Sequence, residues 1–140
     1  MTCNQKSALT TVATAAQTVA ANGFLNFPSN NILTGRSIAH AAGSTTASLG
    51  YGLYQVSVNA DLTPTAAGDI GLQLVRNGAT VPGAEATVTG ATGDTYNVGF
   101  TTLVAVMRSC CAVNNVANLQ VQATAAGTIS NASMSIVRLA

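Results

Sequence analysis

The stretch GYGLYQVSVNADL, residues 50–62, gives the clearest strand signal of the chain, because apolar and polar side chains alternate along it from Tyr54 onward. One face of this stretch is apolar and consists of Tyr54, Val56, Val58, Ala60 and Leu62. The opposite face is polar and consists of Gln55, Ser57, Asn59 and Asp61. A period of two residues is that of a β-strand with one buried face, so the stretch predicts a long strand that ends at Pro64.

A second long alternating run covers residues 96–106. Its first face carries Tyr96, Val98, Phe100, Thr102, Val104 and Val106. The opposite face is apolar as well, since it includes Gly99, Leu103 and Ala105. A strand that is apolar on both faces is expected to be covered on both.

Turn residues divide the rest of the chain at short intervals, as in an all-β sandwich or barrel. Asn77-Gly78 follows a strand candidate at 70–76 and is a strong signal for a two-residue hairpin. Pro82-Gly83 predicts a further bend before a strand at 84–89. Shorter strand candidates lie at 32–33, 37–42, 119–123 and 134–139. The count predicts an all-β chain, a single jelly-roll β-sandwich of about eight to ten antiparallel strands.

The sequence predicts two regions, an N-terminal one at residues 1–21 and a jelly-roll domain at 22–140. An extended arm, a first strand and a short Ala-rich helix all fit the first region. Its threonine content favours an extended conformation.

The composition favours a subunit of an assembly. The 140 residues suffice for one domain with its own core. Charged residues make up only 6% and hydrophobic residues 48%, with a formal net charge of +1, so little charge keeps copies apart. A neutral β-domain of the secreted type is the alternative.

Several classes of function are disfavoured. The basic residues, Lys6, Arg36, Arg76, Arg108 and Arg138, lie far apart, so no basic stripe for nucleic acid is expected. No apolar run approaches the ~18 residues of a membrane span. The stretch 8–21 has a faint signal-peptide shape, but its threonines dilute the apolar centre, so we expect no conventional export signal.

We expect no enzymatic activity, cofactor or metal. The only histidine is His40, and the sequence lacks a Gly-x-Ser-x-Gly nucleophile context, so a pairing with Ser37 has little support. No phosphate-binding glycine loop occurs either. The alternatives left open are a metal or anion held by three copies of His40 in a trimer and calcium held by Asp69 and Asp94. A satisfied strand histidine and solvated turn residues are the favoured interpretations.

The three cysteines, Cys3, Cys110 and Cys111, cannot all pair within one chain. A bond between the adjacent Cys110 and Cys111 would close a strained eight-membered ring. Buried free thiols are the favoured interpretation, and a thiol that links subunits is the alternative.

These residues carry a resemblance to a known family. GYGLYQVSV at 50–58 resembles the strand signature of the complement-q and tumour necrosis factor (TNF) superfamily of trimeric jelly rolls. LQLVRNG at 72–78 and VPGA at 81–84 resemble the following hairpin in the bacterial and phage branch. That branch includes the head domains of exosporium collagen-like glycoproteins and small phage structural proteins. The resemblance covers roughly residues 17–140, without a Gly-X-Y collagen stalk.

The resemblance implies a TNF-like homotrimer in which one sheet of each subunit faces its neighbours about a threefold axis. The strand at 96–106 and the terminal strand are then the expected buried sheet. The interface candidates are Tyr54, Val56, Tyr96, Val98, Phe100, Leu103, Ile136 and Leu139, with Val137 beside them.

The expected function is that of a non-enzymatic structural protein displayed on a particle surface. The leading version is a phage capsid decoration or head-fibre protein at the virion surface, docked to the shell through residues 1–21. The alternatives are a spore-surface protein and a receptor- or glycan-binding tip that uses the loops at 63–69 and 90–95.

Overall fold

The computed structural model describes residues 6–107 and 116–140, and over these ranges the chain contains eleven strands and no helix. The strands are β1 (Ala8–Ala13), β2 (Gln17–Val19), β3 (Ser29–Thr34), β4 (Ile38–Ala39), β5 (Ala47–Leu49), β6 (Gly52–Pro64), β7 (Gly68–Arg76), β8 (Ala79–Gly90), β9 (Tyr96–Val106), β10 (Ala117–Ala123) and β11 (Gly127–Arg138). Three of them, β2, β4 and β5, have only two or three residues, which is why the strand count exceeds the predicted eight to ten. Within the described ranges, nothing forms a helix long and apolar enough to cross a membrane.

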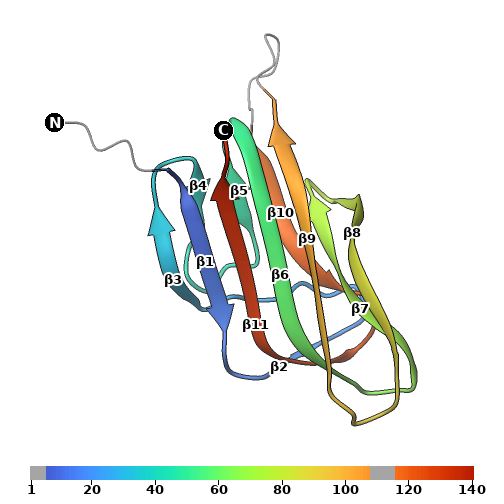
Figure 1. The fold of residues 1–140 in the computed structure, drawn as a ribbon. Helices are drawn as coiled ribbons and strands as arrows, with labels where there is room; N and C mark the ends of the chain where they lie inside the picture. Colours follow the sequence, from blue (N-terminus) through green and yellow to red (C-terminus); the bar gives the residue numbers. More distant parts are fainter. Residues whose placement is uncertain (1–5, 108–115) are drawn as a thin grey trace, which may run out of the picture.

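Two antiparallel sheets pack face to face (Figure 1). The six-stranded sheet has the order β3-β1-β11-β6-β9, and β2 also pairs with β11. The five-stranded sheet has the order β4-β5-β10-β7-β8. The described structure is therefore the predicted all-β sandwich.

The N-terminal residues that the structure describes belong to the sandwich. β1 lies between β3 and β11 and pairs with both, and β2 pairs with the start of β11. Of the conformations that the sequence left open, the structure shows strands. Two strands of the six-stranded sheet therefore precede residue 22, and the division predicted there stays a prediction.

The hairpin at Asn77-Gly78 joins β7 to β8, as predicted. Both residues have positive φ, 50° and 85°, which a type I′ turn requires. The bend predicted at Pro82-Gly83 does not separate two strands, because β8 runs without a break from Ala79 to Gly90. Instead the register with β7 shifts between Gln73 and Val75, and Gly83 takes a φ of 81°. Pro82 and Gly83 therefore lie in an irregular, bulged part of β8.

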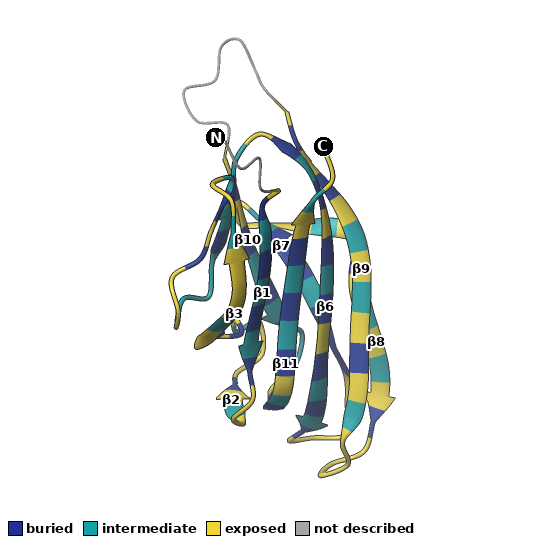
Figure 2. Ribbon diagram, turned by 60° about the vertical axis from the view of Figure 1, so that its left-hand side comes forward, coloured by how far each residue is buried: buried dark blue, intermediate teal, exposed yellow. Residues whose placement is uncertain are grey.

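The core lies between the two sheets and takes one face of every long strand. Figure 2 shows the resulting alternation of buried and non-buried residues along β6 and β11. The largest fully buried side chains come from both sheets and include Tyr54, Leu62, Met134, Leu72, Leu74 and Leu119. Tyr54 keeps its hydroxyl satisfied by donating to the Gly50 carbonyl at 2.9 Å.

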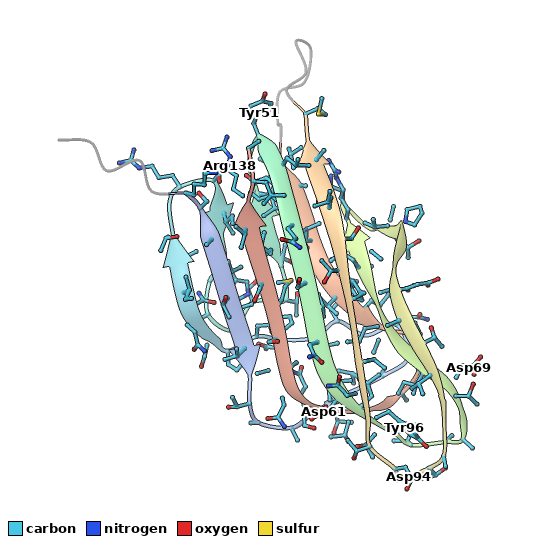
Figure 3. All side chains as sticks on the ribbon, in the orientation of Figure 1. Tyr51, Asp61, Asp69, Asp94, Tyr96 and Arg138 are labelled. Carbon is cyan, nitrogen blue, oxygen red and sulfur yellow. The ribbon has the colours of Figure 1, made fainter. Side chains whose placement is uncertain are left out.

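The two ends of the sandwich differ in charge. Tyr51 and Arg138 lie at the end that holds the C-terminus, whereas Asp61, Asp69 and Asp94 lie at the opposite end (Figure 3). We call the first the terminal end and the second the acidic end.

His40 directly follows β4 and connects it to β3 of the other sheet through a contact with Asn30. It is 6% exposed, and its Nδ1 lies 2.7 Å from Asn30 Oδ1 on β3 while its Nε2 lies 3.0 Å from the Ser44 carbonyl. Asn30 in turn donates from Nδ2 to the His40 carbonyl at 2.8 Å. Both ring nitrogens thus face protein partners, the arrangement of a structural histidine.

Replacing His40 with leucine is expected to lower the free energy of unfolding by about 2 kcal/mol, because leucine has no nitrogen to make the part-buried contacts with Asn30 Oδ1 and the Ser44 carbonyl. Urea denaturation followed by circular dichroism measures this change. The matched control is Ser48→Ala, which removes an exposed bond to Asn118 and should change stability by less than about 0.5 kcal/mol. Equal midpoints for His40→Leu and the wild type would contradict the assigned role.

Candidate functional site

The side of the six-stranded sheet that points away from the core is the candidate site, and we call it the outer face. Strand pairing places its side chains in rows across β1, β11, β6 and β9. From the terminal end, these rows are Ala8–Val137–Gln55–Leu103, Thr10–Ser135–Ser57–Thr101, Val12–Ser133–Asn59–Gly99 and, beyond a bulge in β11, Ser130–Asp61–Asn97. Asp61 is the only charged residue in these rows.

Most polar groups of the outer face bond to one another across strands. Ser57 and Thr101 hydroxyls lie 3.0 Å apart, and those of Thr10 and Ser135 lie 3.3 Å apart. Side chains that already have partners lose less when a second surface displaces water from them. The face can therefore be covered at a small desolvation cost.

The single carboxylate of the outer face is held in a small amide cluster. Asp61 Oδ1 accepts from Asn97 Nδ2 at 2.9 Å, and its Oδ2 accepts from Asn131 Nδ2 at 3.3 Å. Asn97 Nδ2 also lies 2.8 Å from Asn59 Oδ1. Amide donors from two neighbouring strands thus surround the one charge that this face carries.

The terminal end of the outer face is apolar. Leu103 is 58% exposed, and Val137 and Leu139 are each 41% exposed. Leu53 lies among them, since it pairs with Ala105 and its carbonyl accepts from the Leu139 N–H at 2.7 Å. Exposed apolar side chains gathered on one sheet face mark an interaction surface.

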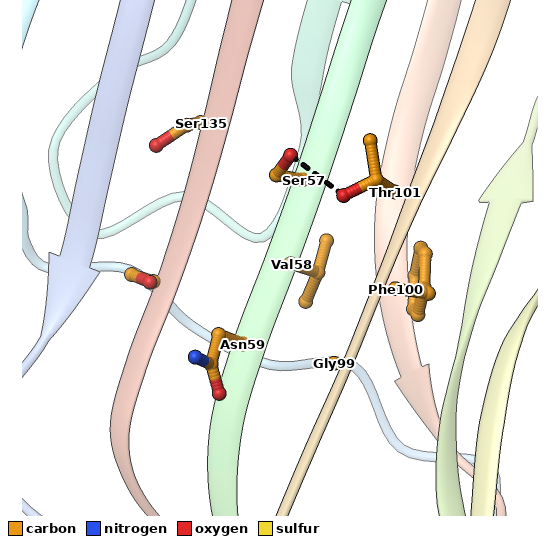
Figure 4. Close-up of a pocket in the computed structure, with 8 residues that line it drawn as sticks. Ser57, Val58, Asn59, Gly99, Phe100, Thr101 and Ser135 are labelled. Carbon is orange, nitrogen blue, oxygen red and sulfur yellow. Dashed lines mark hydrogen bonds between the residues drawn. The ribbon is translucent and has the colours of Figure 1, made fainter.

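A shallow hollow of about 460 Å³ lies in the middle of the outer face, where Gly99 pairs with Asn59 (Figure 4). Hydroxyl and amide side chains line it, namely Ser57, Asn59, Thr101, Ser133 and Ser135. A Cβ at position 99 would lie 2.7 Å from the Val58 carbonyl oxygen, closer than real contacts allow. Glycine is therefore required for the close approach of β9 to β6.

The structure divides the predicted interface residues into two groups. Tyr54, Val56 and Ile136 have no exposed surface, and Val98 is 6% exposed, so these four lie in the core of the single chain. Tyr96 and Phe100 are half-buried on the core-facing side of β9. Leu103 and Leu139 are exposed.

Four of the eight predicted interface residues therefore pack inside the single chain, where they have little or no surface for a second copy. The interface itself stays a prediction. The predicted interface residues lie mostly on the more apolar face of each strand, and that face forms the core of the single chain. The sequence did not select the outer-face residues Thr101, Ser133 and Ser135, because small polar side chains resemble an ordinary solvated face. Leu53 was not selected either, because it lies on the mostly polar face of its strand.

The predicted tip loops do come together at the acidic end. Thr63 and Thr95 hydroxyls lie 2.9 Å apart, and the Gly93 N–H donates to the Pro64 carbonyl at 3.2 Å. Asp69 accepts from the Thr89 hydroxyl at 2.6 Å, so it is tied to β8. Across the described ranges, no three His, Cys, Asp or Glu side chains gather closely enough to hold a metal ion.

The other chemical candidates do not form a site in the described part of the chain. Ser37 has a buried hydroxyl with no hydrogen-bond partner there, and both nitrogens of His40 contact other residues. Cys3, Cys110 and Cys111 lie outside the described residues.

Comparison with known proteins shows the fold. No protein-family model matches the chain, and neither does any curated protein. Among solved structures, the globular domain of zebrafish complement 1qA protein matches with a TM-score of 0.72 at 8% identity, over 96% of this chain and 98% of that one. Murine APRIL at pH 5.0 matches with a TM-score of 0.70 at 12% identity, over 96% and 100%. The PRD1 vertex protein P5 matches with a TM-score of 0.60 at 14% identity, over 96% and 98%.

The chain therefore has the jelly-roll fold of the complement-q and TNF type, and the predicted fold class is confirmed. Identities this low show the fold alone.

Replacing Gly99 with alanine is expected to lower the free energy of unfolding by about 1 to 3 kcal/mol, because β9 must move away from the Val58 carbonyl. Thermal unfolding at one protein concentration measures this change. Gly50→Ala is the matched control, since its Cβ would lie 3.6 Å from the nearest atom, an ordinary contact. If both variants are as stable as the wild type, the close approach at Gly99 is not required.

Proposed function

We propose that the chain is a non-enzymatic structural subunit that forms a homotrimer through its outer face and is displayed on a particle surface. The observation that carries the proposal is the outer face itself. It spans the long strands of one sheet, carries one charge in its rows and becomes apolar at the terminal end.

Energetics supports covering this face. Fully burying a side chain such as leucine or valine is worth on the order of 1.5 to 3 kcal/mol. Leu103, Val137 and Leu139 retain about half of their surface in the single chain, so each has part of that free energy still available. A threefold assembly gains these contributions three times, and it matches the trimeric arrangement that the fold family implies.

The particle is proposed to be a phage virion, with the chain as a capsid decoration or head-fibre protein. The support is the likeness to the vertex protein of phage PRD1, which extends over 96% of this chain. A spore-surface protein is the alternative in the same structural class. Docking to the shell is proposed to involve the terminal end, where Lys6 leads into β1.

A second candidate function is recognition of a receptor or glycan at the acidic end. The observation that favours it is the meeting of the loops at 63–69 and 90–95, at the opposite end from the proposed docking site. A glycan array tests this directly. Glycan binding that is abolished by Asp94→Ala and by Thr95→Ala would support a recognition role for the acidic end. If no glycan binds above background, only the structural role remains.

The trimer is tested by Leu103→Arg, which places a charge in the apolar part of the outer face. Light scattering is expected to give about 42 kDa for the wild type, three times the 14.0 kDa chain, and about 14 kDa for the variant. Burying three unpaired guanidinium groups at one interface costs more than the apolar contacts supply.

Glu85→Arg is the matched control, because Glu85 is an exposed residue of β8 in the five-stranded sheet. It should remain trimeric. A native mass of 14 kDa for the wild type would contradict the trimer. If Leu103→Arg remains trimeric, the interface does not include Leu103. Loss of the trimer on adding reductant would assign the linkage to a cysteine.

A further inference from the structure

A small apolar recess lies at the terminal end, where β6 and β9 meet the C-terminal residues. Its volume is about 250 Å³, and it is lined by Tyr51, Gly52, Leu53, Ala105, Val106, Met107 and Ala140. Sites for whole small-molecule ligands usually have about 300 to 1,000 Å³. The recess is therefore better matched to one large apolar side chain.

Two guanidinium groups flank this recess. Arg138 Nε donates to the Ala140 carbonyl at 3.2 Å and lies within 2.7 Å of where a Cβ on Gly52 would be. Arg76 reaches across from the five-stranded sheet and donates from Nη1 to the Ala105 carbonyl at 2.9 Å. Each group therefore touches residues that line the recess.

Both guanidinium groups keep donors for a partner. A guanidinium has five N–H donors, and within the described ranges each of these two arginines uses one, to a backbone carbonyl. Neither contacts an Asp or Glu side chain in the described ranges. Arginine binds carboxylates in a two-pronged geometry, so the pair is suited to acidic groups on either side of the recess.

The wider charge distribution favours the same partner. Lys6 lies beside the end of β3, since its carbonyl accepts from the Thr34 hydroxyl at 3.0 Å, and Arg36 follows that strand. The terminal end thus gathers the basic residues of the described chain, while Asp61, Asp69 and Asp94 lie at the acidic end (Figure 3). Oppositely charged segments are attracted to the terminal end and steered toward it.

We propose that the recess docks an acidic protein segment, in which one large apolar side chain enters the recess and carboxylates on both sides bind Arg76 and Arg138. The surrounding residue types support a protein partner, because Tyr, Met and Arg are enriched at protein interfaces, and Tyr51 and Met107 line the recess that the two arginines flank. The recess borders the apolar part of the outer face through Leu53, so the inference rests on the recess staying open to solvent at the rim of the proposed trimer.

The test uses fluorescein-labelled peptides and fluorescence anisotropy with the full chain. The probe is an acidic peptide, DEDLEDE, with its leucine replaced by alanine in a second peptide and its acidic residues replaced by lysine in a third. The alanine peptide is expected to bind about tenfold more weakly, because it loses most of the apolar anchor. The lysine peptide should not bind, and salt should weaken binding of the leucine peptide.

Variants of the chain complete the test. Arg76→Gln and Arg138→Gln should each weaken binding of the leucine peptide about threefold and reduce its salt dependence. Glu85→Gln, on the five-stranded sheet, is the matched control and should bind as the wild type does. Met107→Ser removes a recess-lining side chain that is 72% exposed, so it should weaken binding without affecting folding.

Several results would overturn the proposal. If the leucine and alanine peptides bind equally well, no apolar side chain is anchored in the recess. If the wild type and both arginine variants bind the leucine peptide equally well, its carboxylates do not pair with Arg76 or Arg138. If Met107→Ser or the arginine variants change the native mass instead of peptide binding, a second copy of the chain occupies the recess.

Discussion

The two-residue period of a β-strand is the constraint on which this structure depends. Every side chain of β6, β9 and β11 points either into the sandwich or away from it, and the core takes the first set. On these strands, only the outer face is then left to contact a second surface. Its composition is consistent with that use, because small uncharged residues and a few exposed apolar ones replace the mixed charges of an ordinary solvated sheet.

Charge is placed where it does not interfere with the outer face. Asp61 sits in its amide cluster at the edge of the rows, and the other described charges lie mainly at the two ends of the sandwich or on the five-stranded sheet. A chain with 6% charged residues can thus have a nearly uncharged face and two ends of opposite sign. In a threefold assembly whose axis runs along the strands, the three terminal ends point the same way, which is the geometry that one-sided attachment to a particle needs.

Local sequence signals predicted the elements that depend on local chemistry. The strand at 96–106 has the predicted bounds, and the Asn77-Gly78 hairpin is in place because its backbone needs two residues that tolerate positive φ. The place of β1 was not predictable in this way, since its partners in β11 are more than a hundred residues away and its buried Thr11 depends on a bond to the Ser29 carbonyl. Several predicted interface residues lie in the core of the single chain, because alternation identifies an apolar face without showing what covers it. The outer face could be identified only from the cross-strand register, which brings Ser57, Thr101 and Ser135 into one row.

A crystal structure of the assembled chain would show which face each subunit turns toward its neighbours. We expect a threefold axis with β6, β9 and β11 of every copy facing it, and Leu103 and Val137 buried between subunits. An assembly in which these two side chains remain in solvent, or in which the five-stranded sheet forms the contact, would rule out a trimer built on the outer face.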